Sequence, residues 1–327
     1  MIKFTRNAMR SFIGACAFAA CGTAIAQTYP AKPIRWFVPS APAGAFDILT
    51  RALVPGLSPS LGQPLLVDNR GGAAGVLGME LAAKAAPDGY TLLTAGTSQL
   101  IFNKFFYAKL PYDPQKDYAP ISMLADLPLA LYVHTSVPVK SLQELIKYAK
   151  ANPNKLNYGS AGVGHVFHLG MVMLSQRTGI QVTHVPYKGI GPAQQEVFAG
   201  RIELMFSVAS SQMLSQVKAG KLRVLVGGSD KRLSNLPDIP SFEESGIPDM
   251  DVPNWIGLVA PAGTPPDIVA RLNREVARAI ASPEMAKVYE SWSYVQVAST
   301  PEQFGRKINR EIDAWGPVIK SLGITLE

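Results

Sequence analysis

The sequence predicts an α/β protein of two lobes, with mainly parallel sheets and a chain that crosses twice between the lobes. From Ile34 onward, short apolar runs alternate with longer segments of helical period, which is the pattern of βα units. The length of 327 residues suits about two domains. A chain that is 47% hydrophobic and only 17% charged is neither a coiled coil nor wholly disordered.

The first 26 residues predict a secretory signal peptide. Three cations precede an uncharged apolar run, and residues 24–26 read Ala-Ile-Ala, a cleavage pattern. A transmembrane anchor is one alternative, although the apolar stretch of about 15 residues falls short of the length, about 20, that spans a bilayer. A lipoprotein modified at Cys16 or Cys21 is another. We expect a secreted protein whose mature chain begins after residue 26.

Removal of residues 1–26 limits the chemistry of the mature chain. Both cysteines lie in this segment, so we expect neither a disulfide nor a cysteine metal site. Three of the 31 Lys and Arg residues leave with it, and the remaining 28 against 24 Asp and Glu give a net charge of +4. The cations are interspersed with acids, so no nucleic-acid partner is expected. The net positive charge is compatible with binding of a small anion.

The first lobe is predicted to begin with alternating strands and helices. We expect strands at residues 34–38, 65–69 and 91–95, a helix over 46–57 and a small-residue helix ending near Ala85. Pro59 is expected to stop the first of these helices.

A second series follows the proline-rich link at residues 110–114. Ser141 and Glu144 form a capping box, which predicts the start of a helix. The strands expected in this lobe are 129–134, 156–158, 181–185, 202–206 and 222–226, and the helices run from 141 to 151, 165 to 177, 192 to 199 and 211 to 219.

The last third holds three helix starts, at Thr264, Ser282 and Thr300, each a hydroxyl residue followed by proline. Strands are expected only at 255–260 and 294–297. Two isolated strands cannot bury their faces alone, so the tail is expected to return and complete the first lobe. The predicted lobes are residues 27–124 plus 230–327 and residues 125–229, with a double-crossover hinge near 125 and 229.

The common catalytic and cofactor motifs are missing from the sequence. No G-x-S-x-G pentapeptide exists, Gly220-Lys221 is followed by leucine where a P-loop needs Ser or Thr, and neither glycine cluster fits the dinucleotide fingerprint. His165 and His168 have one metal-compatible spacing, yet a helix start with one packed histidine is the interpretation we favour. Asp47 begins a helix, where a carboxylate orders a loop more often than it catalyses. We expect no enzyme, cofactor or metal.

Three polar loops end predicted strands and open helices. They are Pro42-Ala-Gly-Ala45, Thr97-Ser98 and Gly159-Ser-Ala-Gly-Val-Gly164. Glycine and alanine let a ligand approach the backbone, and amides at helix starts attract anions. Loops of this kind facing each other across a cleft would suit a small carboxylate.

Several segments, taken in order, carry a family resemblance. They are Tyr29-Pro-Ala-Lys-Pro-Ile34, Val38-Pro-Ser-Ala-Pro-Ala-Gly-Ala-Phe-Asp47, Asn69-Arg-Gly-Gly-Ala-Ala-Gly75, Pro87-Asp-Gly-Tyr-Thr-Leu92, Leu156-Asn-Tyr-Gly-Ser-Ala-Gly-Val-Gly164, His184-Val-Pro-Tyr-Lys-Gly189, Val217-Lys-Ala-Gly-Lys-Leu222 and Trp255-Ile-Gly-Leu-Val-Ala-Pro-Ala-Gly-Thr-Pro265. Together they resemble the Bug-type substrate-binding proteins of tripartite tricarboxylate transporters.

This resemblance implies a periplasmic binding protein with the two-lobed Venus flytrap fold. Such a protein captures a small carboxylate and delivers it to membrane transporter subunits. The resemblance also implies that the loop matching 41–47 holds a carboxylate through backbone amides, often with ordered waters, and that the loop matching 160–165 closes from the other lobe. Ala43 replaces the usual first glycine, which would strain the loop if that position needs a positive φ.

The site that we expect combines main-chain amides, hydroxyls and aromatic rings, with Lys188 and Arg70 as cations to watch. Its residues are Ala43, Gly44, Ala45, Phe46, Asp47, Thr97, Ser98, Ser160, Gly162, Val163, Gly164 and His165. Because Phe46, His165 and Phe167 supply aromatic groups near the predicted cleft, both an aromatic carboxylate such as terephthalate and aliphatic di- and tricarboxylates are candidate ligands. We expect a monomer. A sensor for a signalling partner is the alternative, and a secreted hydrolase or isomerase using Asp47 and His165 is the less favoured one.

Overall fold

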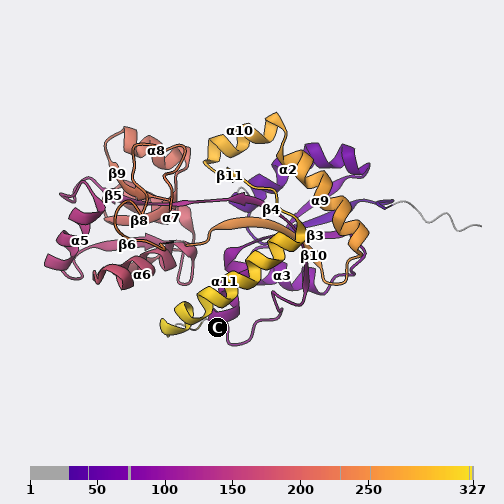
Figure 1. Ribbon diagram of the computed structural model, residues 1–327, viewed down its shortest axis with the longest axis horizontal. Coiled ribbons are helices and arrows are strands. Elements are labelled where there is room, and N and C mark those ends of the chain that lie inside the picture. Colours follow the sequence, from indigo (N-terminus) through magenta and orange to yellow (C-terminus); the bar gives the residue numbers. More distant parts are fainter. Residues whose placement is uncertain are drawn as a thin grey trace, which may run out of the picture.

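The computed structural model describes residues 29–42, 44–72, 75–228, 230–250, 252–323 and 325. The predicted signal peptide and Ala43 lie outside these residues, so the cleavage site and the strain expected at Ala43 stay predictions. The described chain forms two α/β bodies, each built around its own sheet (Figure 1). Among the described residues, we find no helix with the length and apolar character needed to span a bilayer.

The first body is built on a six-stranded sheet in the order β11-β4-β10-β3-β1-β2. Its strands are β1 (Ile34–Val38), β2 (Leu65–Asn69), β3 (Thr91–Gly96), β4 (Tyr118–Asp126), β10 (Trp255–Pro261) and β11 (Val295–Gln296). β1 runs parallel to β2 and β3, whereas β10 is antiparallel to β3 and β4 and β11 is antiparallel to β4.

Helices cover both faces of this sheet. They are α2 (Ala45–Leu61), α3 (Val76–Ala83), the π-helical turn η2 (Ser98–Phe102), α4 (Asn103–Phe106), α9 (Pro266–Ile280), α10 (Pro283–Trp292) and α11 (Pro301–Ser321). Successive strand residues point to opposite faces, so Trp36 packs in the core with α2 and α9, while Phe37 packs in the core with α3 and α11. The cluster around Phe37 continues into the second body, so the two bodies pack against each other in this conformation.

The second body is built on a five-stranded sheet in the order β7-β6-β8-β5-β9. Its strands are β5 (Leu129–His134), β6 (Asn157–Ser160), β7 (Thr183–Pro186), β8 (Leu204–Val208) and β9 (Leu222–Gly227), and its helices are α5 (Leu142–Ala151), α6 (Val166–Thr178), α7 (Ile190–Phe198) and α8 (Ser211–Lys218). β6 is parallel to β7 and β8, but β5 is antiparallel to β8 and β9.

The α/β class is confirmed, but the expectation of mainly parallel sheets is wrong, because both sheets are mixed. A parallel pair needs a return crossover, usually a helix, on one face of the sheet. β5 and β10 are each reached from the other body without such a helix. Each takes a position inside its new sheet, between two strands, and runs in the opposite direction to both.

The chain passes between the sheets at two places that lie side by side. Leu127 N–H donates to Asn254 O at 2.7 Å, and Asn254 Nδ2 donates to Leu127 O at 2.8 Å. The segment after β9 first packs on the second body, where the rings of Phe206 and Phe242 stack with centroids 5.9 Å apart. This packing extends the second body beyond residue 229, the boundary predicted from sequence.

Three local predictions in the first body differ from the structure. The helix expected to start with a hydroxyl cap at Thr264 has Pro265 as its N-cap, without a side-chain hydrogen bond, and Thr264 Oγ1 donates to Pro261 O instead. α2 continues through Pro55 and Pro59 to Leu61 and ends at Gly62, whose φ is +72°. A proline removes one helical hydrogen bond without ending a helix that tertiary packing holds, and Leu57 and Leu61 are buried here. β4 was not predicted at all, because its sequence carries no period-2 alternation.

Candidate functional site

A buried carboxylate orders the loop between β1 and α2. Asp47 Oδ1 accepts hydrogen bonds from Arg51 Nε at 2.8 Å and from Asn69 Nδ2 at 2.9 Å. The same Asn69 amide donates to Ser40 O at 3.2 Å, which ties the end of β2 to the loop after β1. The carboxylate is engaged by its neighbours, as the loop-ordering interpretation of Asp47 predicts, and it is not presented for acid–base chemistry.

The start of α2 presents main-chain donors. Gly44 is the N-cap in an extended conformation (φ −78°, ψ 169°), and no side chain caps the helix. The N–H groups of the first helical turn have no acceptor within the helix, so those of Ala45 and Phe46 are directed out of its start. This end of α2 also carries a partial positive charge, which suits an anion.

The ring of Phe46 lies over the end of β3. A Cβ on Gly96 would lie 2.5 Å from this ring, so a glycine is needed to admit it. The ring is half-buried against the core shared with α2 and β3. It therefore forms an apolar wall beside the donors of α2.

Thr97 and Ser98 follow at the junction of β3 and η2. Thr97 is buried, and its Oγ1 accepts the N–H of Trp255 at 3.1 Å. A hydroxyl that accepts one hydrogen bond still has its own proton to donate. Ser98 begins η2 and is half-buried. Single π-helical turns occur often at functional sites, which is consistent with a ligand-binding role for the junction at Thr97 and Ser98.

The loop 160–165 of the second body turns on two glycines. Gly162 and Gly164 have φ of +133° and +78°, conformations that favour glycine. Ser160 is fully buried; its Oγ donates to Gly162 O at 2.9 Å, accepts the Gly162 N–H at 3.1 Å and lies 2.7 Å from His184 Nε2. The Ser160 hydroxyl and the Gly162 amide, both expected to face a ligand, are thus hydrogen-bonded within the second body in this conformation.

His165 offers a neutral N–H donor at the end of this loop. It is the N-cap of α6, and its Nδ1 accepts the N–H of Phe167 at 3.3 Å, so the ring proton lies on Nε2. Burial lowers the pKa of His165 to about 4, yet part of its side chain stays accessible.

The loop 160–165 contacts the first body at Phe106. A Cβ on Gly164 would lie 3.1 Å from the Phe106 ring, which belongs to α4 in the first body. α4 continues directly from η2, so the loop 160–165 packs beside the segment that follows Thr97. At the tip of the same loop, the side chain of Val163 is 40% exposed, unusual for a large apolar residue and available for a ligand.

Three other residues from the sequence prediction do not join this arrangement. Phe167 is buried in the core, in edge-to-face contact with His165. Arg70 is held at the surface by Asp68, with Nε 2.9 Å from Oδ1. Lys188 is exposed on the turn after β7.

Sequence reasoning missed the side chains that support the loop 160–165. His184 pairs with Ser160, and His168 Nδ1 accepts the N–H of Gly164 at 3.2 Å. Both imidazoles stack near Tyr158, with ring centroids 4.2 Å apart for the two histidines. The sequence signals available were the spacing of His165 and His168 and the histidine that begins His184-Val-Pro-Tyr. Neither signal predicts that the rings of His168 and His184 stack.

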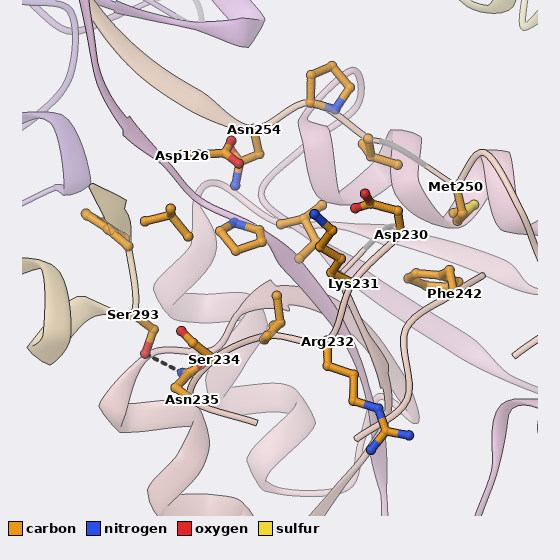
Figure 2. A pocket seen from close by; sticks show the side chains of 18 of the residues that line it. Asp126, Asp230, Lys231, Arg232, Ser234, Asn235, Phe242, Met250, Asn254 and Ser293 are labelled. Carbon is orange, nitrogen blue, oxygen red and sulfur yellow. Dashed lines mark hydrogen bonds between the residues drawn. The ribbon is translucent and has the colours of Figure 1, made fainter. Parts of the chain in front are cut away.

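A separate cavity of about 1120 Å³ lies at the passages between the bodies (Figure 2). Its walls include Asp126 and Asn254 from the passages and Ser293 and Asn235, whose side chains hydrogen-bond at 2.7 Å. Among the described residues, none of those predicted for the ligand site lines it. Over the described part of the chain, no group of three or more His, Asp, Glu or Cys side chains is placed to hold a metal ion.

Comparison with known proteins assigns the family. Residues 49–324 match the model of a family described as "Tripartite tricarboxylate transporter family receptor". The chain belongs to this receptor family. The Bug-type resemblance of the sequence is thereby confirmed, and this member of the receptor family is a solute-binding receptor, not an enzyme.

Individual relatives of this receptor family member agree with the assignment. Protein BugT of Bordetella pertussis is 35% identical over 92% of this chain and 93% of its own length. The solved structure of R. palustris Rpa4515 with adipate is 33% identical, covers 91% of this chain and 99% of that chain, and has a TM-score of 0.81. MatC from Rhodopseudomonas palustris with bound malate is 30% identical, covers 89% and 100% of the two chains, and has a TM-score of 0.78.

Proposed function

We propose that this receptor captures a small carboxylate between its two bodies and delivers it, in the periplasm, to the membrane subunits of a tripartite transporter. The observation that supports the proposal is the contact of Gly164 with Phe106, by which the loop 160–165 packs against the segment η2–α4 that follows Thr97. Phe46, at the start of α2, packs over Gly96 just before Thr97. The family supports the transporter as partner, and the predicted signal peptide supports the location.

The proposed grip uses neutral donors. The α2 amides of Ala45 and Phe46, the Thr97 hydroxyl and the Nε2–H of His165 can each donate to a carboxylate oxygen. Hydrogen bonds to a charged acceptor are stronger than those between neutral groups, so several such donors can hold an anion without a paired cation. Neutral partners also allow release, because no buried ion pair has to be broken.

The ligand class that we propose is a small dicarboxylate. The relatives solved with adipate and malate support an aliphatic one. The Phe46 ring beside the α2 donors and the exposed Val163 leave room for an aromatic dicarboxylate such as terephthalate in the same proposal. The binding test therefore has to vary the length of the ligand and compare aliphatic with aromatic ligands.

Closure about a hinge is part of the proposal. The paired passages at Leu127 and Asn254 are where the bodies would rotate, with residues 230–250 moving with the second body. The first lobe would then be 27–126 plus 252–327. A ligand that contacts both bodies stabilises their closed arrangement more than an open one, so binding and closure are coupled.

The test is a binding screen on the full chain without its first 26 residues. Thermal shift with aliphatic and aromatic mono-, di- and tricarboxylates should show a rise in Tm that grows with ligand concentration for a dicarboxylate, confirmed by calorimetry. Recovery of unchanged ligand by mass spectrometry separates a receptor from an enzyme. The absence of binding across the whole panel, terephthalate, adipate and malate included, would overturn the carboxylate assignment.

A further inference from the structure

Two histidines and a tyrosine form a stacked cluster directly behind the loop 160–165. His168 comes from α6, His184 from β7 and Tyr158 from β6. The ring planes of the two histidines are 22° from parallel with centroids 4.2 Å apart, and His184 stacks on Tyr158 at 4.8 Å. Three elements of the second body thus meet in one cluster of rings.

Each histidine of this cluster holds one end of the loop. His184 Nε2 lies 2.7 Å from Ser160 Oγ, at the end of β6, and His168 Nδ1 accepts the N–H of Gly164 at 3.2 Å, just before α6. Between these two points the chain passes through two glycines with positive φ, which have little preference of their own for one conformation. The cluster therefore supplies the restraint that the glycines do not.

We propose that His168 and His184 are positioning residues for ligand capture: they fix the loop 160–165 in its binding conformation from behind, without contacting the ligand. This proposal rests on the proposed function, because it concerns the same ligand loop. The held loop keeps Val163 exposed at its tip and sets the position of His165 at the N-cap of α6. Holding these groups in place before binding reduces the ordering cost of association.

The role that we propose for the cluster needs neutral imidazoles. His168 can accept the Gly164 N–H only while its Nδ1 carries no proton. Burial, followed by the neighbouring His184 and His165, lowers the pKa of His168 to about 4, and burial lowers that of His184 to about 4. The titratable groups that face the pair are Tyr158 on β6 and His165 on α6. Both histidines are neutral in the range where a receptor has to work.

The test compares conservative and disruptive variants at both histidines. H168N places an acceptor where Nδ1 lies, and H184Q places a polar atom where Nε2 lies, whereas H168L and H184L remove both contacts. H134Q is the control, because His134 bonds to Ser136 Oγ outside the cluster. Calorimetry with adipate and malate gives the affinity, urea unfolding without ligand gives the stability, and hydrogen exchange reports the Gly164 amide.

We expect H168L and H184L each to weaken binding about tenfold or more. H168L should also speed exchange at Gly164, because the Gly164 N–H loses its acceptor, whereas H184L removes the contact with Ser160 Oγ at the other end of the loop. H168N and H184Q should restore affinity to within about threefold of the original protein, and H134Q should leave it unchanged. We expect the affinity of the original protein to fall toward pH 4, after correction for protonation of the ligand. In the H168N/H184Q double variant this fall should be smaller.

Two results would overturn the proposal. In one, the leucine variants lose stability but keep their ligand affinity and the slow hydrogen exchange of the Gly164 amide. The histidines would then stabilise the fold without positioning the loop. In the other, asparagine and glutamine fail to rescue affinity although the variants fold. If the original protein binds neither adipate nor malate, affinity is measured with whichever carboxylate of the wider panel binds. If none binds, the proposed function fails by itself, and exchange at the Gly164 amide still decides whether the histidines position the loop.

Discussion

Gly164 and Phe106 belong to different bodies, yet the ring of Phe106 fills the space where a side chain at 164 would begin. A Cβ there would lie 3.1 Å from the ring, and the ring itself is buried. This contact joins the loop of the second body to the segment that follows Thr97. It makes residue 164 sensitive both to backbone conformation and to the approach of the two bodies.

Gly164→Ala should weaken carboxylate binding about tenfold. A φ of +78° costs an alanine about 1–2 kcal/mol, and its Cβ would push against a ring that has no room to move. Calorimetry measures the affinity, and small-angle scattering with ligand measures closure. Gly179→Ala is the matched control, because φ is +72° and the nearest atom, Lys150 Cε, is 3.9 Å away. Equal affinities for the two variants would mean that only backbone strain matters.

Thr97→Val should lower affinity about tenfold and also destabilise the fold by about 1–3 kcal/mol, because the buried N–H of Trp255 loses its acceptor. Thr97→Ser keeps the hydroxyl and should retain most of both. Calorimetry and urea unfolding separate the two effects. A valine variant that binds as tightly as the original protein would remove Thr97 from the proposed site.

Asp47→Ala should destabilise the protein by about 1–3 kcal/mol, because Arg51 and Asn69 lose a shared acceptor and the loop after β1 loses its tie. Asp68→Ala is the control, since its ion pairs with Arg35 and Arg70 lie at the surface and should contribute less than about 1 kcal/mol. Urea unfolding gives both values. A larger loss at Asp68 than at Asp47 would contradict the loop-ordering role.

Stability should rise with pH between about 4 and 6.5. His165, His168 and His184 have their pKa lowered to about 4 by burial, from an ordinary value of 6.5. Across this window the unfolded chain binds more protons than the folded one, so the free energy of unfolding increases with pH, and the penalty is complete below pH 4. Carboxylates titrate nearby, so the measurement is the difference in urea unfolding between the original protein and H168N/H184Q. Parallel curves for the two proteins would contradict the prediction.

Local chemistry made many elements predictable. The hydroxyl caps at Ser282 and Thr300 start α10 and α11 as expected, because a cap depends on neighbours a few residues away. The first three strands appear at almost their predicted ranges. β4 was missed, since it is defined by its partners β10 and β11 and carries no pattern of its own.

The candidate site also combines features set by the local sequence with features set by tertiary contacts. The glycines at 162 and 164 and the helix start at 44–47 could be recognised from sequence, because each is a local requirement of the backbone. The pairing of Ser160 with His184, and of Gly164 with His168, joins residues on different elements. No sequence pattern specifies which side chain will reach a given loop from behind.

The sequence by itself determined the α/β class, the loops that can approach an anion, the lack of thiol chemistry in the predicted mature chain and the family resemblance. The tertiary structure alone decided the mixed direction of the sheets, the contact of Phe106 with Gly164 and the stacked histidines. The reason is the range of the forces involved. Turns, caps and helices are set by interactions between near neighbours, whereas strand direction and ring stacking depend on which distant segments are buried together.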